Sequence, residues 1–218
     1  ITNATNVNIG IMRFITVGGT VIHPVKDIDE VTTSSSIGDL TVRIAESDDD
    51  AEESLTDNAV SLANAQLSLT TKVGGGVVLI DQRISNSSDD AEQENDGSFS
   101  TTSTDLELLR DDDTQQVGLR FRNISIPVGA TILSANIEFV IDERQYDYNT
   151  PVDARFYAEA DDTGTFSSFN KVGNRTKTAA TETWYITANS PSVGDTITSP
   201  DLKDLVAEVV AAGTWASG

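Results

Sequence analysis

Val152-Asp-Ala-Arg-Phe-Tyr-Ala-Glu159 alternates apolar and polar side chains along its whole length. Successive side chains of a β-strand point to opposite faces of a sheet, so this stretch predicts a strand with one face buried. Similar runs recur along the chain, at Asn8–Thr16, Leu40–Ile44, Val77–Ile84, Val117–Phe121 and Ala135–Ile141.

Clusters of Gly, Asn, Asp, Ser and Pro separate these runs, as in antiparallel sandwiches and barrels. In Ile126-Pro-Val-Gly-Ala130, for example, Pro127 fixes φ at the second turn position and Gly129 can take positive φ. The sequence therefore predicts an all-β, antiparallel, jelly-roll-like β-sandwich. Its core should include three aromatic residues on apolar strand faces, Phe121, Phe139 and Phe156.

One segment departs from the alternation. Apolar residues recur at helical spacing from Leu202 to Val210, with polar residues between them. The residues expected to cap, start, charge and end such a helix are present: Ser199, Pro200, Asp201 and Gly213. We predict one amphipathic helix, residues 200–212, packed over the end of the sandwich.

The chain is strongly acidic, with 35 Asp and Glu against 14 Lys and Arg in 218 residues, a net charge of −21. Such a charge repels phosphate backbones and anionic lipids, which argues against nucleic-acid and membrane-surface binding.

No cysteine is present, so a disulfide framework or thiolate metal site is excluded. No apolar run has the ~20 residues of a membrane span. The first residue is Ile1, as expected for a processed or partial chain, and we predict an extracellular or cell-surface location.

An acidic element occurs twice. Arg83-Ile-Ser-Asn-Ser-Ser-Asp-Asp-Ala-Glu-Gln93 echoes Arg43-Ile-Ala-Glu-Ser-Asp-Asp-Asp-Ala-Glu-Glu53, 40 residues earlier. Clustered carboxylates repel one another unless a cation lies among them, and hard oxygen ligands suit Ca²⁺. The two loops supply these candidate calcium ligands: Asp89, Asp90 and Glu92 in the second loop, and Asp48, Asp49, Asp50 and Glu52 in the first. The alternative for both loops is a solvated charge run.

Several kinds of chemistry can be weighed from single residues. His23 is the only histidine, so a zinc site with several imidazoles is impossible, and no nucleophile-elbow motif is present. A glycosidase needs only two suitably spaced carboxylates and stays open as an enzyme class.

Exposed aromatic residues could stack on a sugar ring, and the candidates are Tyr146, Tyr148, Trp184 and Tyr185. Trp215 follows the predicted helix and is assigned to the core.

Three glycines, Gly74-Gly-Gly76, form the best candidate joint in the chain. They divide it into residues 1–73, with the N-terminal strand and the first acidic element, and residues 77–218, a jelly-roll module. The two parts could also form one composite sandwich.

The second part carries an ordered set of motifs: Ser87-Ser-Asp-Asp-Ala-Glu92, Asp105-Leu-Glu-Leu108, Gln116-Val-Gly-Leu-Arg-Phe121, Ile126-Pro-Val-Gly-Ala-Thr-Ile132, Ala135-Asn-Ile-Glu-Phe139, the Pro200–Val210 helix and Gly213-Thr-Trp-Ala-Ser-Gly218. This order resembles the DNRLRE-type extracellular modules of large secreted proteins of marine bacteria. The resemblance implies a non-catalytic β-sandwich, often near cations and in adhesive or polysaccharide-handling contexts.

In modules of that type the Trp-x-Ser-Gly stretch leads into an apolar closing strand, whereas this sequence ends at Gly218. The N-terminus offers a segment of that character, with an apolar set of Ile9, Ile11, Met12, Phe14 and Ile15. Three outcomes stay open. The segment closes its own sandwich, as in a circular permutation. It completes a neighbouring copy and builds a filament. Or the chain is cut from a longer tandem array.

These observations predict a non-enzymatic, calcium-stabilised, extracellular structural or adhesive protein that associates with itself. The alternative is a carbohydrate-binding module of a secreted polysaccharide-degrading enzyme, with a surface polysaccharide as its partner.

Overall fold

The structure, a computed structural model, describes most of the chain. The described residues are 15–17, 20–22, 35–46, 60–108, 114–127, 129–144, 152–161, 164–186, 192–212 and 215.

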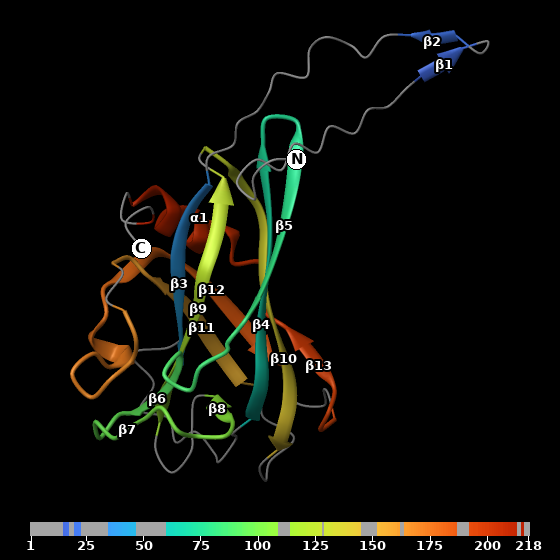
Figure 1. Cartoon of the computed structure of the whole chain (residues 1–218). Coiled ribbons are helices and arrows are strands. Elements are labelled where there is room, and N and C mark those ends of the chain that lie inside the picture. The colour runs from blue at the N-terminus through green and yellow to red at the C-terminus, as the bar shows by residue number, and fades with distance from the viewer. Residues whose placement is uncertain are drawn as a thin grey trace.

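Two antiparallel sheets face each other and form a sandwich (Figure 1). The first sheet has the order β13-β10-β4-β5, with β8 also paired to β4. Its strands are β4 (Val60–Val73), β5 (Gly76–Arg83), β8 (Leu106–Leu108), β10 (Thr131–Arg144) and β13 (Thr196–Thr198). The second sheet has the order β12-β11-β3-β9-β6-β7. Its strands are β3 (Ser35–Glu46), β6 (Asp90–Glu94), β7 (Phe99–Ser100), β9 (Gln115–Pro127), β11 (Val152–Glu159) and β12 (Lys177–Ile186). The predicted antiparallel β-sandwich is thus confirmed.

A short hairpin precedes the sandwich strands. β1 (Ile15–Val17) pairs with β2 (Thr20–Ile22), with Ile15 opposite Ile22. Among the described strands, neither β1 nor β2 pairs with any other.

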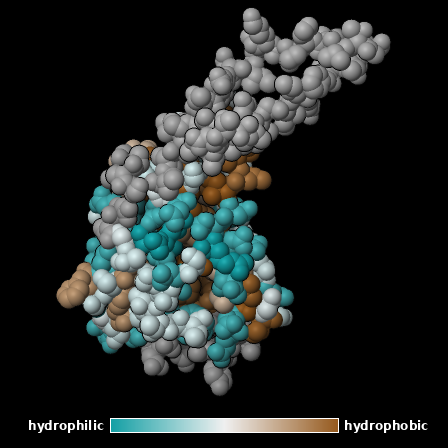
Figure 2. All heavy atoms as spheres, in the orientation of Figure 1, coloured by the Kyte–Doolittle hydropathy of each residue, from teal (hydrophilic) through white to brown (hydrophobic). Residues whose placement is uncertain are grey.

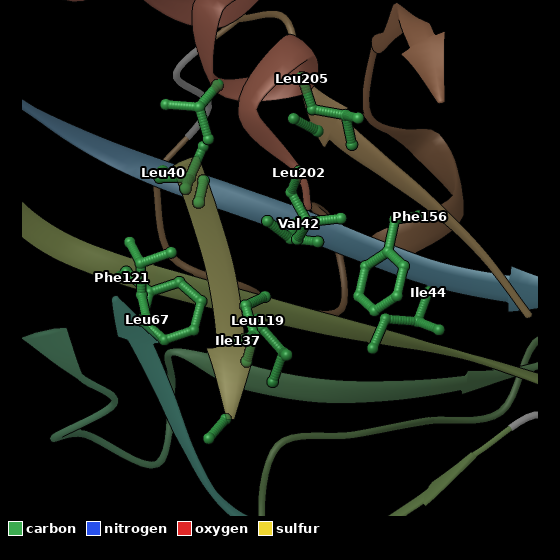
Figure 3. Close-up of a cluster of buried hydrophobic side chains, with 14 of the residues drawn as sticks. Leu40, Val42, Ile44, Leu67, Leu119, Phe121, Ile137, Phe156, Leu202 and Leu205 are labelled. Atoms are coloured by element: carbon green, nitrogen blue, oxygen red, sulfur yellow. The ribbon is translucent and has the colours of Figure 1, made fainter. Parts of the chain in front are cut away.

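The alternation of β11 has the predicted effect. Ala154, Phe156 and Ala158 are buried, whereas Arg155 and Tyr157 between them are partly exposed. The buried rows of both sheets meet in one core, to which β3, β4, β9, β10 and β11 all contribute (Figure 3). Phe121, Phe139 and Phe156 are completely buried in it, as predicted. Each such side chain contributes about 1.5–3 kcal/mol on burial.

The C-terminal helix α1 (Lys203–Ala211) closes one side of this core through Leu205, Val206 and Val209. It begins later than the predicted residue 200, and Ser199 does not cap it. The Ser199 hydroxyl instead accepts a hydrogen bond from the Ile137 N–H (2.9 Å) and donates one to the Pro200 carbonyl (2.8 Å). Asp201 Oδ1 accepts from the Lys203 N–H at 3.1 Å and from the Ala135 N–H at 2.9 Å, so it ties the helix start to β10.

The glycines of residues 74–76 lie at a hairpin turn. Val73 and Gly76 are cross-strand partners, and Gly74, at φ +56°, lies in the left-handed region that glycine adopts without strain. β3 and β4, from the first predicted part, lie in the same sandwich as the strands after Val77. The glycines therefore turn the chain within one sheet and do not join two separate units.

Candidate functional site

A run of neighbouring exposed apolar side chains follows β5, an outer strand of the first sheet. Leu79 is 72% exposed, Val77 59% and Val78 37%. Leu133 on β10 is also exposed on this sheet. Figure 2 shows hydrophobic side chains gathered over the region that β5 occupies in Figure 1. Contiguous apolar surface of this kind marks an interaction site more often than scattered single residues do.

The pairing of β5 explains this exposure. β4 lies on one side of β5, in register from Gln66–Arg83 to Val73–Gly76, and no described strand lies on the other side. Within the described residues, the backbone N–H and C=O groups on that side have no sheet partner, which makes them a template for a further strand. The hairpin end, Gly76-Val-Val-Leu-Ile80, carries no charged side chain that would oppose such pairing.

β9 of the second sheet packs against β5. Near this contact, part of β9 also lacks a described strand on one side. β6 pairs with β9 only from Gln115 to Leu119, although β3 pairs with β9 as far as Pro127. Beyond Arg120, the side of β9 away from β3 therefore has no described strand partner. As far as the described strands go, the sandwich is thus incomplete along one edge.

The other outer strands are short or partly covered. β13 has three residues and β7 has two. β12 is longer and is covered only near its start, where the Glu208 carboxylate on α1 accepts hydrogen bonds from the Ala179 and Ala180 N–H groups, both at 2.8 Å. These bonds hold the pKa of Glu208 below its usual value. β5 is therefore the outer strand of the described sandwich best suited to strand addition.

Asp89, the residue just before β6, is paired with arginine side chains. Asp89 is completely buried, and its Oδ1 accepts from Arg120 Nη1 at 3.0 Å. Arg120 also binds Asp39 on β3, and Arg122 Nη1 lies 3.7 Å from the other Asp89 oxygen. Arginine thus compensates the charge of Asp89, a predicted calcium ligand, and links β3, β9 and the β6 loop.

Asp90 and Glu92 lie apart from that ion pair, because alternate residues of β6 face opposite ways. Glu92 is buried, and its Oε1 accepts from the Glu107 N–H at 2.9 Å. Burial, and then a hydrogen bond with the Glu107 carboxyl, raise the pKa of Glu92 to about 8. Glu92 is therefore mostly protonated at neutral pH and can donate to a carboxylate.

A hollow of about 180 Å³, lined by polar and apolar residues in equal number, lies where β4 is bulged between Ala63 and Gln66. Arg83, Asp90 and Asp105 line it, together with Asn64, which has a positive φ of 56°. Burial is the largest of the effects that raise the pKa of Asp90. Within the described ranges, no three His, Cys, Asp or Glu side chains are grouped so that they could hold a metal ion. Asp48, Asp49, Asp50 and Glu52 lie outside these ranges.

The predicted aromatic candidates differ in exposure. Trp184 lies in the core, stacked on Phe139 with ring centroids 5.6 Å apart, so it cannot act as an exposed platform. Tyr185, the next residue on β12, is 58% exposed. Tyr146 and Tyr148 lie outside the described residues. Trp215 is buried, as predicted.

Of the predicted assembly strand, Ile9, Ile11, Met12 and Phe14 lie outside the described residues. Ile15 begins β1.

No described helix is long and apolar enough to cross a membrane. Comparisons with protein-family models, with curated proteins and with solved structures gave no match.

Proposed function

We propose that this protein is a non-enzymatic, extracellular structural module that polymerises when its N-terminal strand pairs with the sandwich of a neighbouring copy. The observation that carries the proposal is the apolar side of β5, beside which no described strand lies. Covering a side chain such as Leu79 contributes about 1.5–3 kcal/mol at full burial, and new backbone hydrogen bonds would add to this.

The charge distribution supports the N-terminal segment as the strand that is added. All 35 acidic residues follow Lys26, whereas two of the 14 basic residues, Arg13 and Lys26, lie within the first 26 residues. Two copies with a net charge of −21 repel each other, and an arm that is apolar and cationic reduces this repulsion where it binds. An arm of this composition favours contact with the acidic remainder of another copy.

A location outside the cell and calcium binding are further parts of the proposal. The high acidity suits a medium that contains salt or divalent cations, which screen or bind the carboxylates. Because arginines hold Asp89, a calcium site at the second loop would use Asp90 and Glu92, with Asp48–Glu52 as a separate candidate. The resemblance to DNRLRE-type modules is compatible with this role and stays a prediction.

Removing residues 1–17 tests the assembly. The full chain should form particles much heavier than its 23.3 kDa in light scattering, and the shortened chain should be monomeric. A synthetic peptide of residues 6–17 should bind the shortened chain, and a scrambled peptide should not. A shortened chain that assembles as well as the full one would contradict the proposal. Specific, saturable binding in a glycan array at millimolar Ca²⁺ would instead favour the carbohydrate-binding alternative.

A further inference from the structure

We infer that β1 of one copy adds antiparallel to the free side of β5 of a second copy, with Ile15 opposite Leu79 and Arg13 opposite Asp81. This inference rests on the proposed function and names the surface that accepts the N-terminal strand. It commits to a second copy of this chain as the occupant.

The acceptor side of β5 has two distinct rows of side chains. Val78 is the partner of the completely buried Thr71, so Val78 and Ile80 belong to the inner row. Val77, Leu79 and Asp81 belong to the outer row. Asp81 Oδ1 accepts a hydrogen bond from the Ser68 hydroxyl at 2.6 Å, and a carboxylate has room for further donors. The outer row therefore offers two apolar side chains followed by an anion.

The N-terminal segment has the matching order. Arg13, Ile15 and Val17 are alternate residues, so in a strand they share one face: a cation followed by two apolar side chains. In the antiparallel register, Val17 lies opposite Val77, Ile15 opposite Leu79 and Arg13 opposite Asp81. On the other face, Phe14 lies opposite Ile80. Apolar and opposite-charge pairs directly across two strands stabilise a sheet.

Other registers lose these pairs. A shift by one residue would bring the face of Phe14 and Thr16 to Val77 and Leu79, and it would move Arg13 away from Asp81. A shift by two residues would place Arg13 opposite either Leu79 or Arg83. A parallel strand could also bring Arg13 to Asp81, with Ile11 opposite Leu79. The antiparallel register is favoured because it uses Ile15–Val17, which are in strand conformation in β1.

The contact joins two different surfaces, β1 of one copy and β5 of another. Each copy then keeps one free β5 and one free β1, so the contact repeats and produces an open-ended filament. In the hairpin with β2, the backbone N–H and C=O groups of Ile15 and Val17 face Ile22 and Thr20, because these pairs lie next to and two residues beyond the turn. In the register with Leu79 the same groups face β5, so β5 replaces β2 as the partner of β1.

Cysteine cross-linking tests the register, because the chain has no cysteine of its own. Full-length Ile15→Cys and Leu79→Cys chains, one with a larger tag, are mixed under oxidising conditions and separated on a non-reducing gel. Residues directly opposite on neighbouring strands lie within disulfide range. We expect the mixed dimer to form about tenfold faster than with a Val193→Cys chain as partner, because pairing raises the effective concentration. Val193 is an exposed apolar residue that precedes β13.

An Ile11→Cys chain mixed with Leu79→Cys tests the parallel arrangement. Faster cross-linking of this pair would overturn the antiparallel register. Equal rates with Leu79→Cys and Val193→Cys, in a chain that assembles, would show that β5 is not the acceptor. If the full chain stays monomeric in light scattering under the same conditions, the proposed function fails together with this inference.

Discussion

Leu79 and Thr70 are cross-strand partners on β5 and β4, but no described strand lies on the other side of Leu79, whose side chain is 72% exposed. A leucine on the outer strand of a sheet would usually be covered by a helix or loop, or replaced by a charged residue. β12, which has a comparable position in the second sheet, is partly covered near its start, where Glu208 binds the Ala179 and Ala180 N–H groups. The contrast makes β5 the surface on which the proposed assembly depends.

Replacing Leu79 with lysine should abolish assembly and leave the fold intact. The substitution adds a cation where the cationic N-terminal strand is proposed to bind, and it removes the exposed apolar contact. Because Leu79 is exposed, the free energy of unfolding should change by less than about 0.5 kcal/mol. Light scattering and urea unfolding measure the two effects. Val193→Lys, with the same change in charge, should assemble like the unmodified chain, and equal loss in both variants would point to charge alone.

Replacing Glu92 with glutamine should stabilise the protein progressively as the pH rises. The pKa of Glu92 is about 8 in the folded protein and near its ordinary 4.5 when unfolded. Between these values the folded state holds a proton that the unfolded state lacks, so this group's stabilising contribution falls as the pH rises. Each pKa unit of difference corresponds to about 1.4 kcal/mol.

Urea unfolding from pH 4.5 to 9 measures this linkage. The difference in unfolding free energy between Glu92→Gln and the unmodified chain should grow from pH 5 to 8 and then level off. Glu138→Gln, at an exposed position of β10, is the control for the loss of one glutamate charge. A constant difference for Glu92→Gln would show that Glu92 ionises normally.

Replacing Arg120 with methionine should destabilise the fold by about 3–5 kcal/mol, because it leaves the buried Asp89 carboxylate without its main partner. Arg122→Met removes a longer, more exposed pair to the same carboxylate and should cost less than about 1 kcal/mol. Shifts of the urea midpoint measure both. Similar midpoints for the two variants would mean that the Arg120 ion pair is not a major part of the stability.

Calcium should raise the melting temperature of the full chain relative to chelator at equal ionic strength. The expected stabilisation is about 2.7 kcal/mol when free Ca²⁺ is one hundred times its dissociation constant. If Glu92 is a ligand, Ca²⁺ must displace its proton, and the effect should be larger at pH 9 than at pH 6. A pH-independent effect that Asp48→Asn and Asp50→Asn remove would place calcium at the first loop. An unchanged melting temperature would show that neither loop binds calcium.

Local patterns predicted several of the strands and the helix, because alternation and helical spacing depend on neighbouring residues. β11 and α1 illustrate this, but β4 and β12 were not among the predicted runs. The start of α1 was missed because the Ser199 hydroxyl bonds to Ile137 of a distant strand. The sequence did not show whether Trp184 is buried or exposed, because its burial depends on packing against Phe139 in the other sheet.

The candidate site was harder to predict than the fold. An acidic run has the same appearance whether it binds a cation, water or arginine, and Asp89 meets Arg120 only through the pairing of β6 with β9. The uncharged run Gly76-Val-Val-Leu-Ile80 was visible in the sequence. This run forms an outer strand because of the order of strands in the sheet, and local periodicity does not predict that order.

The most direct test of the central claim is the weight-average mass of the full chain, measured by sedimentation equilibrium over a wide range of concentrations. Contact between two different surfaces of each copy predicts a mass that rises continuously with concentration above 23.3 kDa, without a plateau. A mass that stays at one chain, or levels off at two as for a closed pair of β5 strands, would contradict polymerisation through β1 and β5.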